Sequence, residues 1–416
     1  MKFQLSQNNW QGFEPVEINL PDDWDVQFYG IPGDEVPAMT KEQLQEKINK
    51  PYGAETIYEQ AKKAKEVCII FDDISRGTPV KPIAEIVVEE LKRAGVKDEN
   101  IRFICALGTH GAHNRIDFVN KLGADICDHY PVYNHNCYEN NVCIGKTVKG
   151  YDVCCNAEMM ACDLRIGIGA ITPHPFNGFG GGAKIIFPGM ASIETIAANH
   201  KVAVDDVRAR KINAVANMGD ISVDGMRKEI EEMAGMVGQF FKIDCIINTK
   251  LEIVDLYAGD MIEEYYASIP AAQKLYAMPR FEDKDIIITN ANAKANEAQI
   301  AIGLASLVVN KEGGDIVVVN RTHMGQCTHY LFGEFGKNAG GRMHGRLPKV
   351  RPWVNNYIFW MEPDFGSRHW YGDIDKQIYV NTWQEVIDLL KKTHGPGTKV
   401  GIIADGTISC FEQKNS

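Results

Sequence analysis

The sequence lacks the features of a membrane, secreted or nucleic-acid-binding protein. It contains no apolar run of the roughly 18 residues that a membrane-spanning helix needs. Residues 1–21 have no continuous apolar core and no small-residue cleavage site, so we expect a cytoplasmic protein. The formal net charge of -11 provides no basic excess to bind phosphate backbones. We therefore expect neither a nucleic acid nor a membrane as a partner.

Paired cysteine motifs are also absent. The chain has 11 cysteines, an odd number, and none of them forms a CxxC pair. Without a secretory signal, this usage indicates reduced thiols rather than a disulfide framework. Five cysteines gather between Cys137 and Cys162. Their spacing is not that of a zinc site, so buried thiols are the favoured interpretation and a structural metal site is the alternative.

Alternating strands and helices are what the sequence does contain. A chain of 416 residues exceeds what one hydrophobic core usually organises. Short β-branched runs alternate with longer amphipathic stretches, which is typical of α/β proteins. We expect strands near 67–71, 101–107 and 164–170, two more near 243–259, and a second series between 285 and 405, with helices near 82–95 and 261–277.

This pattern predicts two α/β domains with mainly parallel sheets and an active-site cleft between them. Proline and charged residues mix near 271–284, before the second series of strands. We place an N-terminal α/β domain, which carries the cofactor-binding and catalytic motifs, at 1–272. A C-terminal α/β domain at 280–416 would close the substrate cleft.

Four polar segments follow expected strands, at 72–79, 108–113, 172–184 and 289–299. Ligands of parallel sheets bind at the carboxyl ends of the strands. The four segments are therefore expected to converge on the cleft.

The most unusual segment is HPFNGFGGGAK, which ends at Lys184. Gly178 and Gly180, Gly181 and Gly182 allow the backbone to pass close to a ligand and to aim N–H groups at an anion. No GK[ST] closes the segment, so it is not a P-loop, and it fits G-x-G-x-x-A only loosely. A lysine at its end can pair with phosphate or serve as a covalent attachment point. A purely structural turn is the alternative.

Histidines are the candidate bases. His110 and His174 leave the ends of different expected strands and can face one cleft from two sides. His200 falls in an expected helix after the glycine segment, and the role of His113 is open.

The pattern Asp73-x-x-Arg76 offers an always-charged fork for a carboxylate or phosphate, with an acid to orient it. A salt bridge at a helix start, with Thr78 as the cap, explains the pattern equally well.

Taken together, DDISRGTP, GTH, HPFNGFGGGAKIIFPG and a histidine 16 residues after the lysine resemble the nickel-pincer nucleotide-dependent lactate racemase family. The resemblance implies a pyridinium-3,5-bisthiocarboxylic acid mononucleotide that carries nickel and is covalently attached to a lysine. That lysine matches Lys184, the histidine that binds nickel matches His200, and Gly180, Gly181 and Gly182 would lie near the nucleotide. The enzymes that synthesise the cofactor become expected partners.

The resemblance also implies the reaction, which is inversion at C2 of a 2-hydroxy acid by reversible hydride transfer to the tethered cofactor. The two histidines that act as alternating acid and base match His110 and His174. Asp73 and Arg76 would lie near the substrate. Direct removal of the Cα proton by a histidine of ordinary pKa, about 6.5, would be prohibitively uphill, which explains why a hydride acceptor is needed.

One departure from the family affects the substrate. Lactate racemases carry a pattern resembling Gln-x-x-Lys, in which Gln299 matches the glutamine and Ile302 stands where the lysine should be. Lys294 is a candidate replacement. Asn290, Asn292 and Asn296, together with the polar segment THMGQCTH at 322–329, are candidates to bind a more hydroxylated acid. We expect a malate-like acid or a sugar acid rather than lactate. The sequence does not determine the oligomeric state.

Two other functions compete with this interpretation. A divalent-metal hydrolase could use His110, His113, His174 and His200, although no HExxH motif is present. A noncatalytic phosphometabolite-binding protein is the second alternative, but it gives no task to two histidines at separate strand ends.

Overall fold

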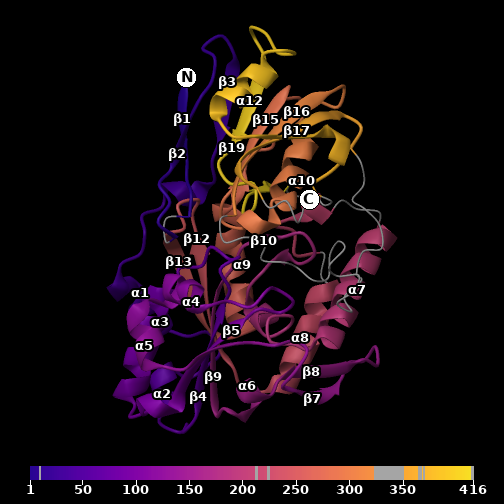
Figure 1. The fold of residues 1–416 in the computed structure, drawn as a ribbon. Helices are drawn as coiled ribbons and strands as arrows, with labels where there is room; N and C mark the ends of the chain where they lie inside the picture. Colours follow the sequence, from indigo (N-terminus) through magenta and orange to yellow (C-terminus); the bar gives the residue numbers. More distant parts are fainter. Residues whose placement is uncertain are drawn as a thin grey trace.

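The computed structural model describes residues 1–8, 11–210, 214–222, 225–322, 351–363, 368 and 371–413. In this part of the chain, two six-stranded sheets form the framework, and helices cover them (Figure 1). The first sheet belongs to the earlier part of the chain and the second mainly to the later part. The predicted α/β class with mainly parallel sheets is confirmed.

The first sheet is parallel except at one edge. Its strands lie in the order β13 (Ile253–Asp260), β12 (Phe241–Ile247), β9 (Leu164–Ala170), β4 (Val67–Asp72), β5 (Ile101–Ala106) and β6 (Val132–Asn134). Only the pair β12 and β13 is antiparallel. The carboxyl ends of β4, β5 and β9 therefore meet at one edge, and the first three polar segments begin there.

Both faces of this sheet are buried, which explains its continuous apolar strands. In β4, Val67, Ile69 and Phe71 pack into one core, while Cys68 and Ile70 pack into the other. The first face is covered by α1 (Lys41–Ile48), α2 (Ile57–Ala61), α3 (Val80–Arg93), α4 (Arg115–Leu122), α5 (Ala124–His129) and α9 (Glu263–Leu275). The second face is covered by α6 (Ala157–Ala161), α7 (Ile193–Arg210) and α8 (Gly225–Val237).

The second sheet is parallel throughout. Its strands lie in the order β18 (Gln377–Val380), β17 (Val354–Glu362), β16 (Gly314–Arg321), β15 (Ile286–Ala291), β19 (Lys399–Ile403) and β3 (Asp25–Tyr29). In β16, alternate residues again serve opposite cores, one of which includes α10 (Gln299–Val308) and the other α12 (Trp383–Leu390).

A strand from the beginning of the chain pairs with a strand near its end in the second sheet. β3 pairs with β19, and Figure 1 shows the indigo N-terminal strands alongside the yellow C-terminal segment. The hairpin of β1 (Lys2–Leu5) and β2 (Val16–Asn19) packs into the same core as α12. The proposed division into 1–272 and 280–416 stays a prediction, but the second sheet draws on both of those ranges.

Most expected elements are present within a few residues of their predicted bounds. The helix expected at 82–95 is α3, the helix expected at 261–277 is α9, and the strand expected at 164–170 is β9. Strands β3 and β17 were not predicted, because their places in the sheet depend on partners that are distant in the chain. Among the described helices, none has the length and apolar character to cross a membrane.

The expectation that all the cysteines are reduced thiols was wrong. Cys143 and Cys154 form a disulfide across the hairpin of β7 (Asn141–Lys146) and β8 (Asp152–Asn156). They are opposite one another in the register, a relation that sequence spacing does not reveal. Among the described residues, no three histidine, cysteine or acidic side chains are placed to hold a metal, and this includes the cysteines between 137 and 162.

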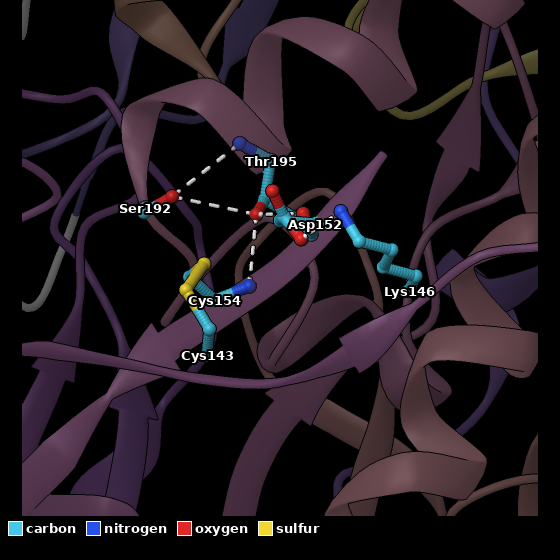
Figure 2. The surroundings of a disulfide bond; sticks show 6 residues. All are labelled: Cys143, Lys146, Asp152, Cys154, Ser192 and Thr195. Atoms are coloured by element: carbon cyan, nitrogen blue, oxygen red, sulfur yellow. Dashed lines mark hydrogen bonds and ion pairs between the residues drawn. A yellow bond between two sulfur atoms is a disulfide. The ribbon is translucent and has the colours of Figure 1, made fainter. Parts of the chain in front are cut away.

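The disulfide hairpin is bonded to the start of α7, as Figure 2 shows. The backbone N–H of Cys154 donates to Thr195 Oγ1 at 3.0 Å, and Ser192 N–H donates to the carbonyl of Cys154 at 2.9 Å. The hairpin therefore supports the first turn of a helix that carries His200.

We expect replacement of both Cys143 and Cys154 by alanine to lower the free energy of unfolding by about 2–3 kcal/mol, because a closed loop of this size restricts the unfolded chain. Urea denaturation of the nonreduced protein measures the change, with Cys127→Ala as a control outside the disulfide. Alkylation of both thiols in native, nonreduced protein would contradict the bond.

Candidate active site

Nearly all the candidate site residues from the sequence analysis line one cavity of about 310 Å³. Its lining includes Asp73, Arg76, His110, His174, Gly180, Gly181, Lys184, His200, Lys294 and Gln299. These side chains come from the loops after β4, β5, β9 and β15 and from α7 and α10. The expected convergence of the four polar segments is therefore observed, and both sheets contribute to the cavity.

Asp73 is paired with His110 rather than with Arg76. Its Oδ2 lies 2.5 Å from His110 Nδ1, and its Oδ1 accepts the N–H and hydroxyl of Ser75. Burial opposes the charge, but His110 and Arg76 hold the pKa of Asp73 well below its usual range. An ionised Asp73 keeps the proton of a neutral His110 on Nδ1. The Nε2 atom of His110 then carries the lone pair that a base requires.

The loop after β4 is held by buried polar groups. Lys121 Nζ donates to Asp72 Oδ1 at 2.9 Å and to the carbonyls of Arg76 and Thr78 at 2.8 and 2.9 Å. His113 Nε2 accepts the N–H of Ile74 at 3.1 Å. His113 is outside the cavity lining and supports the loop. Thr78 donates to Asp72, so it does not cap α3.

Arg76 faces an acid that we did not identify from the sequence. Its Nη1 lies 2.9 Å from Glu297 Oε2, and its Nη2 lies 3.4 Å from Oε1. Glu297 follows β15, so this bidentate pair joins loops that extend from different sheets. The only available signal was that Glu297 lies in the fourth polar segment. Its partner is 221 residues away, and no local pattern predicts that pairing.

Lys294 reaches the cavity from the same loop as Glu297. Its Nζ donates to the carbonyl of Pro173 at 2.9 Å, beside His174. Burial lowers the pKa of Lys294 to about 8. Asp405 and Thr407 fix the loop by accepting the N–H groups of Ala293 and Lys294. Lys294 is thus positioned where it can bind an anion.

The asparagines of this loop do not line the cavity. Asn290 is fully buried and donates to the carbonyls of Ser6 and Ala404, and Asn292 donates to Thr249. The three asparagines are therefore not placed to bind a hydroxylated acid in this cavity, and residues 323–329 of the polar segment lie outside the described residues. Ile302 is buried in the core of the second sheet, away from the cavity.

Hydrogen bonds to buried charged side chains hold the glycine segment in place. Gly182 N–H donates to Asp244 Oδ2 at 2.5 Å, and Asp244 Oδ1 lies 2.5 Å from Lys242 Nζ. Arg227 donates to the carbonyl of Gly181 at 3.0 Å. Gly181 has a φ of +88°, and a Cβ there would lie 2.8 Å from Asp244 Oδ2. Glycine is required at this position because the loop passes directly over the carboxylate. Gly182 is buried outside the cavity lining, whereas Gly180 and Gly181 line the cavity.

Lys184 and His174 are in direct contact, with Nζ and Nε2 2.9 Å apart. His174 Nδ1 accepts the N–H of Phe176 at 3.1 Å. Burial and the positive charges of Arg76 and Arg227 lower the pKa of Lys184 well below its usual range. Burial and Lys184 likewise lower the pKa of His174. Burial and the neighbouring positive charges therefore favour the uncharged forms of both basic groups.

His200 lies in α7 with its Nδ1 3.0 Å from the carbonyl of Ile196. The carbonyl can only accept, so the proton is on Nδ1 and the lone pair is on Nε2. This is the arrangement of a histidine that ligates a metal.

Comparison with known proteins shows which proteins the chain is similar to. Residues 11–211 match the profile of the lactate racemase N-terminal domain. The chain is 29% identical over 284 residues to the lactate racemase of Lactiplantibacillus plantarum and 24% identical over 277 residues to that of Thermoanaerobacterium thermosaccharolyticum. These matches support a lactate racemase-like family, which is the family that the motifs indicated.

These sequence alignments span 67% and 65% of this chain, and 65% and 63% of the two lactate racemases. The similarity in fold covers more of the chain than these sequence alignments do. The lactate racemase apoprotein of Thermoanaerobacterium thermosaccharolyticum matches 99% of this lactate racemase-like chain and 100% of its own, with a TM-score of 0.73 at 18% identity. A Thermotoga maritima protein matches 91% of this chain and 98% of its own, with a TM-score of 0.64 at 17% identity.

We expect Glu297→Gln to lower the free energy of unfolding by about 1–3 kcal/mol, because it leaves the partly buried Arg76 without its charged partner. Thermal and urea denaturation measure the change, with the exposed Glu312→Gln as the matched control. Equal stability of the two variants would show that the pair contributes nothing to holding the two loops together.

Proposed function

We propose that the protein is a racemase or epimerase that inverts C2 of a 2-hydroxy carboxylic acid. The observation that carries this proposal is that His110 and His174 reach one cavity from different strands, with Lys184 at the same cavity. An inversion needs a base for the hydroxyl group in each of two substrate orientations, and two histidines can meet that need. The names of the relatives support the same reaction class.

The cavity fits the nickel-pincer nucleotide that the family resemblance implies. Burial and the neighbouring cations favour the neutral amine of Lys184, which is the form that makes a covalent bond. His200 carries its proton on Nδ1 and is suited to bind nickel through Nε2. Gly180 and Gly181 leave a bare backbone at the wall beside the lysine. When bound, this group supplies a reversible acceptor for the C2 hydride.

The side chains around the cavity can perform the remaining tasks. One histidine would take the hydroxyl proton of the substrate, and the 2-keto acid formed by oxidation at C2 is planar. Arg76 and Lys294 bind its carboxylate while the keto group rotates. The second histidine would return a proton to the oxygen after this rotation, which completes the inversion. Asp73 keeps His110 in the required tautomer throughout.

The absence of the family lysine at Ile302 supports a substrate other than lactate, either a malate-like acid or a sugar acid. Lys294 offers a replacement ammonium group, but it comes from the loop before α10 rather than from the helix. Gln299 remains in the lining and can bind a further oxygen of the substrate. Because the ammonium group of Lys294 comes from a different position than the family lysine, it favours an acid whose shape differs from that of lactate.

We expect protein co-expressed with the cofactor-synthesis enzymes to carry a nucleotide-sized adduct on Lys184 and about one nickel. Intact mass, peptide mapping and metal analysis measure both, with Lys184→Ala as the negative control. The loaded protein should invert 2-hydroxy acids, and His110→Asn or His174→Asn should abolish inversion while the adduct remains. An unmodified Lys184, when a lactate racemase processed in parallel is loaded, would refute the tether.

The charge of Lys294 should make the affinity for the substrate depend on pH. It is charged below its pKa of about 8 and neutral above it. A charged hydrogen bond to a carboxylate is lost on deprotonation, so the affinity of the loaded protein for its acid should fall roughly tenfold as the pH rises through this value. Titration calorimetry at pH 7 and 9 measures the fall. Lys294→Arg keeps its charge and should remove the pH dependence, whereas an equal fall in this variant would exclude Lys294 as the anion receptor.

A further inference from the structure

We propose that Lys184 of the unloaded protein is a covalent capture site for 2-keto acids, which it binds as an imine. The choice of a 2-keto acid rests on the proposed function, because this is the oxidised form of the proposed substrate. The reactivity of the amine rests only on the contacts around Lys184. It requires neither nickel nor nucleotide.

The hydrogen bonds of His174 determine the state of Lys184. The N–H of Phe176 donates to His174 Nδ1, so this nitrogen carries a lone pair and the ring proton is on Nε2. That proton points at Lys184 Nζ, 2.9 Å away. Nζ must accept it, and only a neutral amine has a lone pair with which to do so. A charged ammonium would instead require the opposite tautomer, which would place two N–H groups against each other at Phe176.

The surrounding charges favour the same state. Arg76, Arg227 and Lys294 all oppose a further positive charge on Lys184, and Glu297 acts in the opposite direction but is itself paired with Arg76. Arg227 cannot lose its proton under ordinary conditions. Protonation of Lys184 would therefore add a further buried positive charge to those of the neighbouring side chains. Burial and these charges lower the pKa of Lys184 accordingly.

The cavity provides what a 2-keto acid needs beside a neutral amine. Lys184, His174, Arg76 and Lys294 all line the same space of about 310 Å³. The cations attract the carboxylate and so concentrate the acid next to Nζ. A ketone that lacks the carboxylate has no such attraction.

The reaction is a condensation that balances without any oxidant or reductant. The Nζ lone pair attacks the keto carbon and forms the C–N bond, and the carbonyl electrons move to oxygen. The two amine protons pass to that oxygen, and His174 Nε2 relays protons between Nζ and the oxygen. Water leaves, and the C=N bond of the imine forms.

The imine uses the atom that the cofactor tether also requires. A 2-keto acid should therefore slow the loading of Lys184 reversibly. Unloaded protein and keto acid form a dead-end complex, which hydrolysis of the imine releases.

The test uses full-length unloaded protein, incubated with pyruvate at pH 7 and quenched with sodium borohydride, which fixes an imine as a secondary amine. Peptide mapping should place the adduct on Lys184 at least about tenfold above any exposed lysine, since those remain protonated at this pH. Acetone, which lacks the carboxylate, should label far less. Lys184→Arg should lose the adduct, and Lys391→Arg, a change at an exposed lysine, should keep it.

The pH profile separates a neutral amine from an ordinary lysine. Labelling of Lys184 should not rise from pH 7 to 9 and should fall as Lys294 loses its charge near pH 8, whereas an ordinary lysine gains about tenfold for each pH unit in this range. A tenfold rise per unit at Lys184, or equal labelling of the exposed lysines, would overturn the proposal. His174→Asn should slow the labelling without moving it to another lysine.

The outcome is independent of the proposed activity. Labelling at Lys184 together with a loaded protein that inverts no 2-hydroxy acid would support the capture site and refute the racemase. Inversion by the loaded protein without labelling of the unloaded form would support the racemase and refute the capture site.

Discussion

The site depends on how one cavity accommodates several basic side chains at close range. Arg76, Arg227, Lys184 and Lys294 surround a volume of about 310 Å³ or the glycine loop beside it, together with two histidines. They cannot all be charged and unpaired in a buried space, because desolvation and mutual repulsion both oppose it. Arg76 is paired with Glu297, Arg227 is bonded to backbone carbonyls, and burial with these charges lowers the pKa of Lys184 well below its usual range. The reactive amine is a consequence of this distribution of charge.

The loops that carry these groups are held by other buried polar side chains. Lys121 binds three oxygens of the loop after β4, and Asp405 holds the loop after β15. Asp244 binds the glycine loop through Gly182. Each anchor satisfies backbone groups that would otherwise be buried without partners. The anchors lie outside the recognisable motifs, yet they determine where the motif residues point.

Sequence patterns predicted the framework well because the central strands are buried on both faces. Continuous apolar runs such as those of β4 and β9 have few alternatives to a parallel sheet. The short strand β3 and the mixed strand β17 were missed, since their placement depends on partners distant in the chain. The disulfide between Cys143 and Cys154 was missed for the same reason, because its pairing is set by the register of a hairpin.

The sequence by itself indicated the α/β class and, through its resemblance to the lactate racemase family, the residues that gather at the cavity. Lys184, His110, His174, His200 and Arg76 stand in single segments, and the resemblance implied their roles. Only the tertiary structure decided how these residues are paired. Asp73 binds His110, Arg76 binds Glu297, His113 supports a loop and Lys184 contacts His174. Local patterns reveal which groups leave a strand end, whereas protonation and partners depend on distances between segments that are remote in the chain.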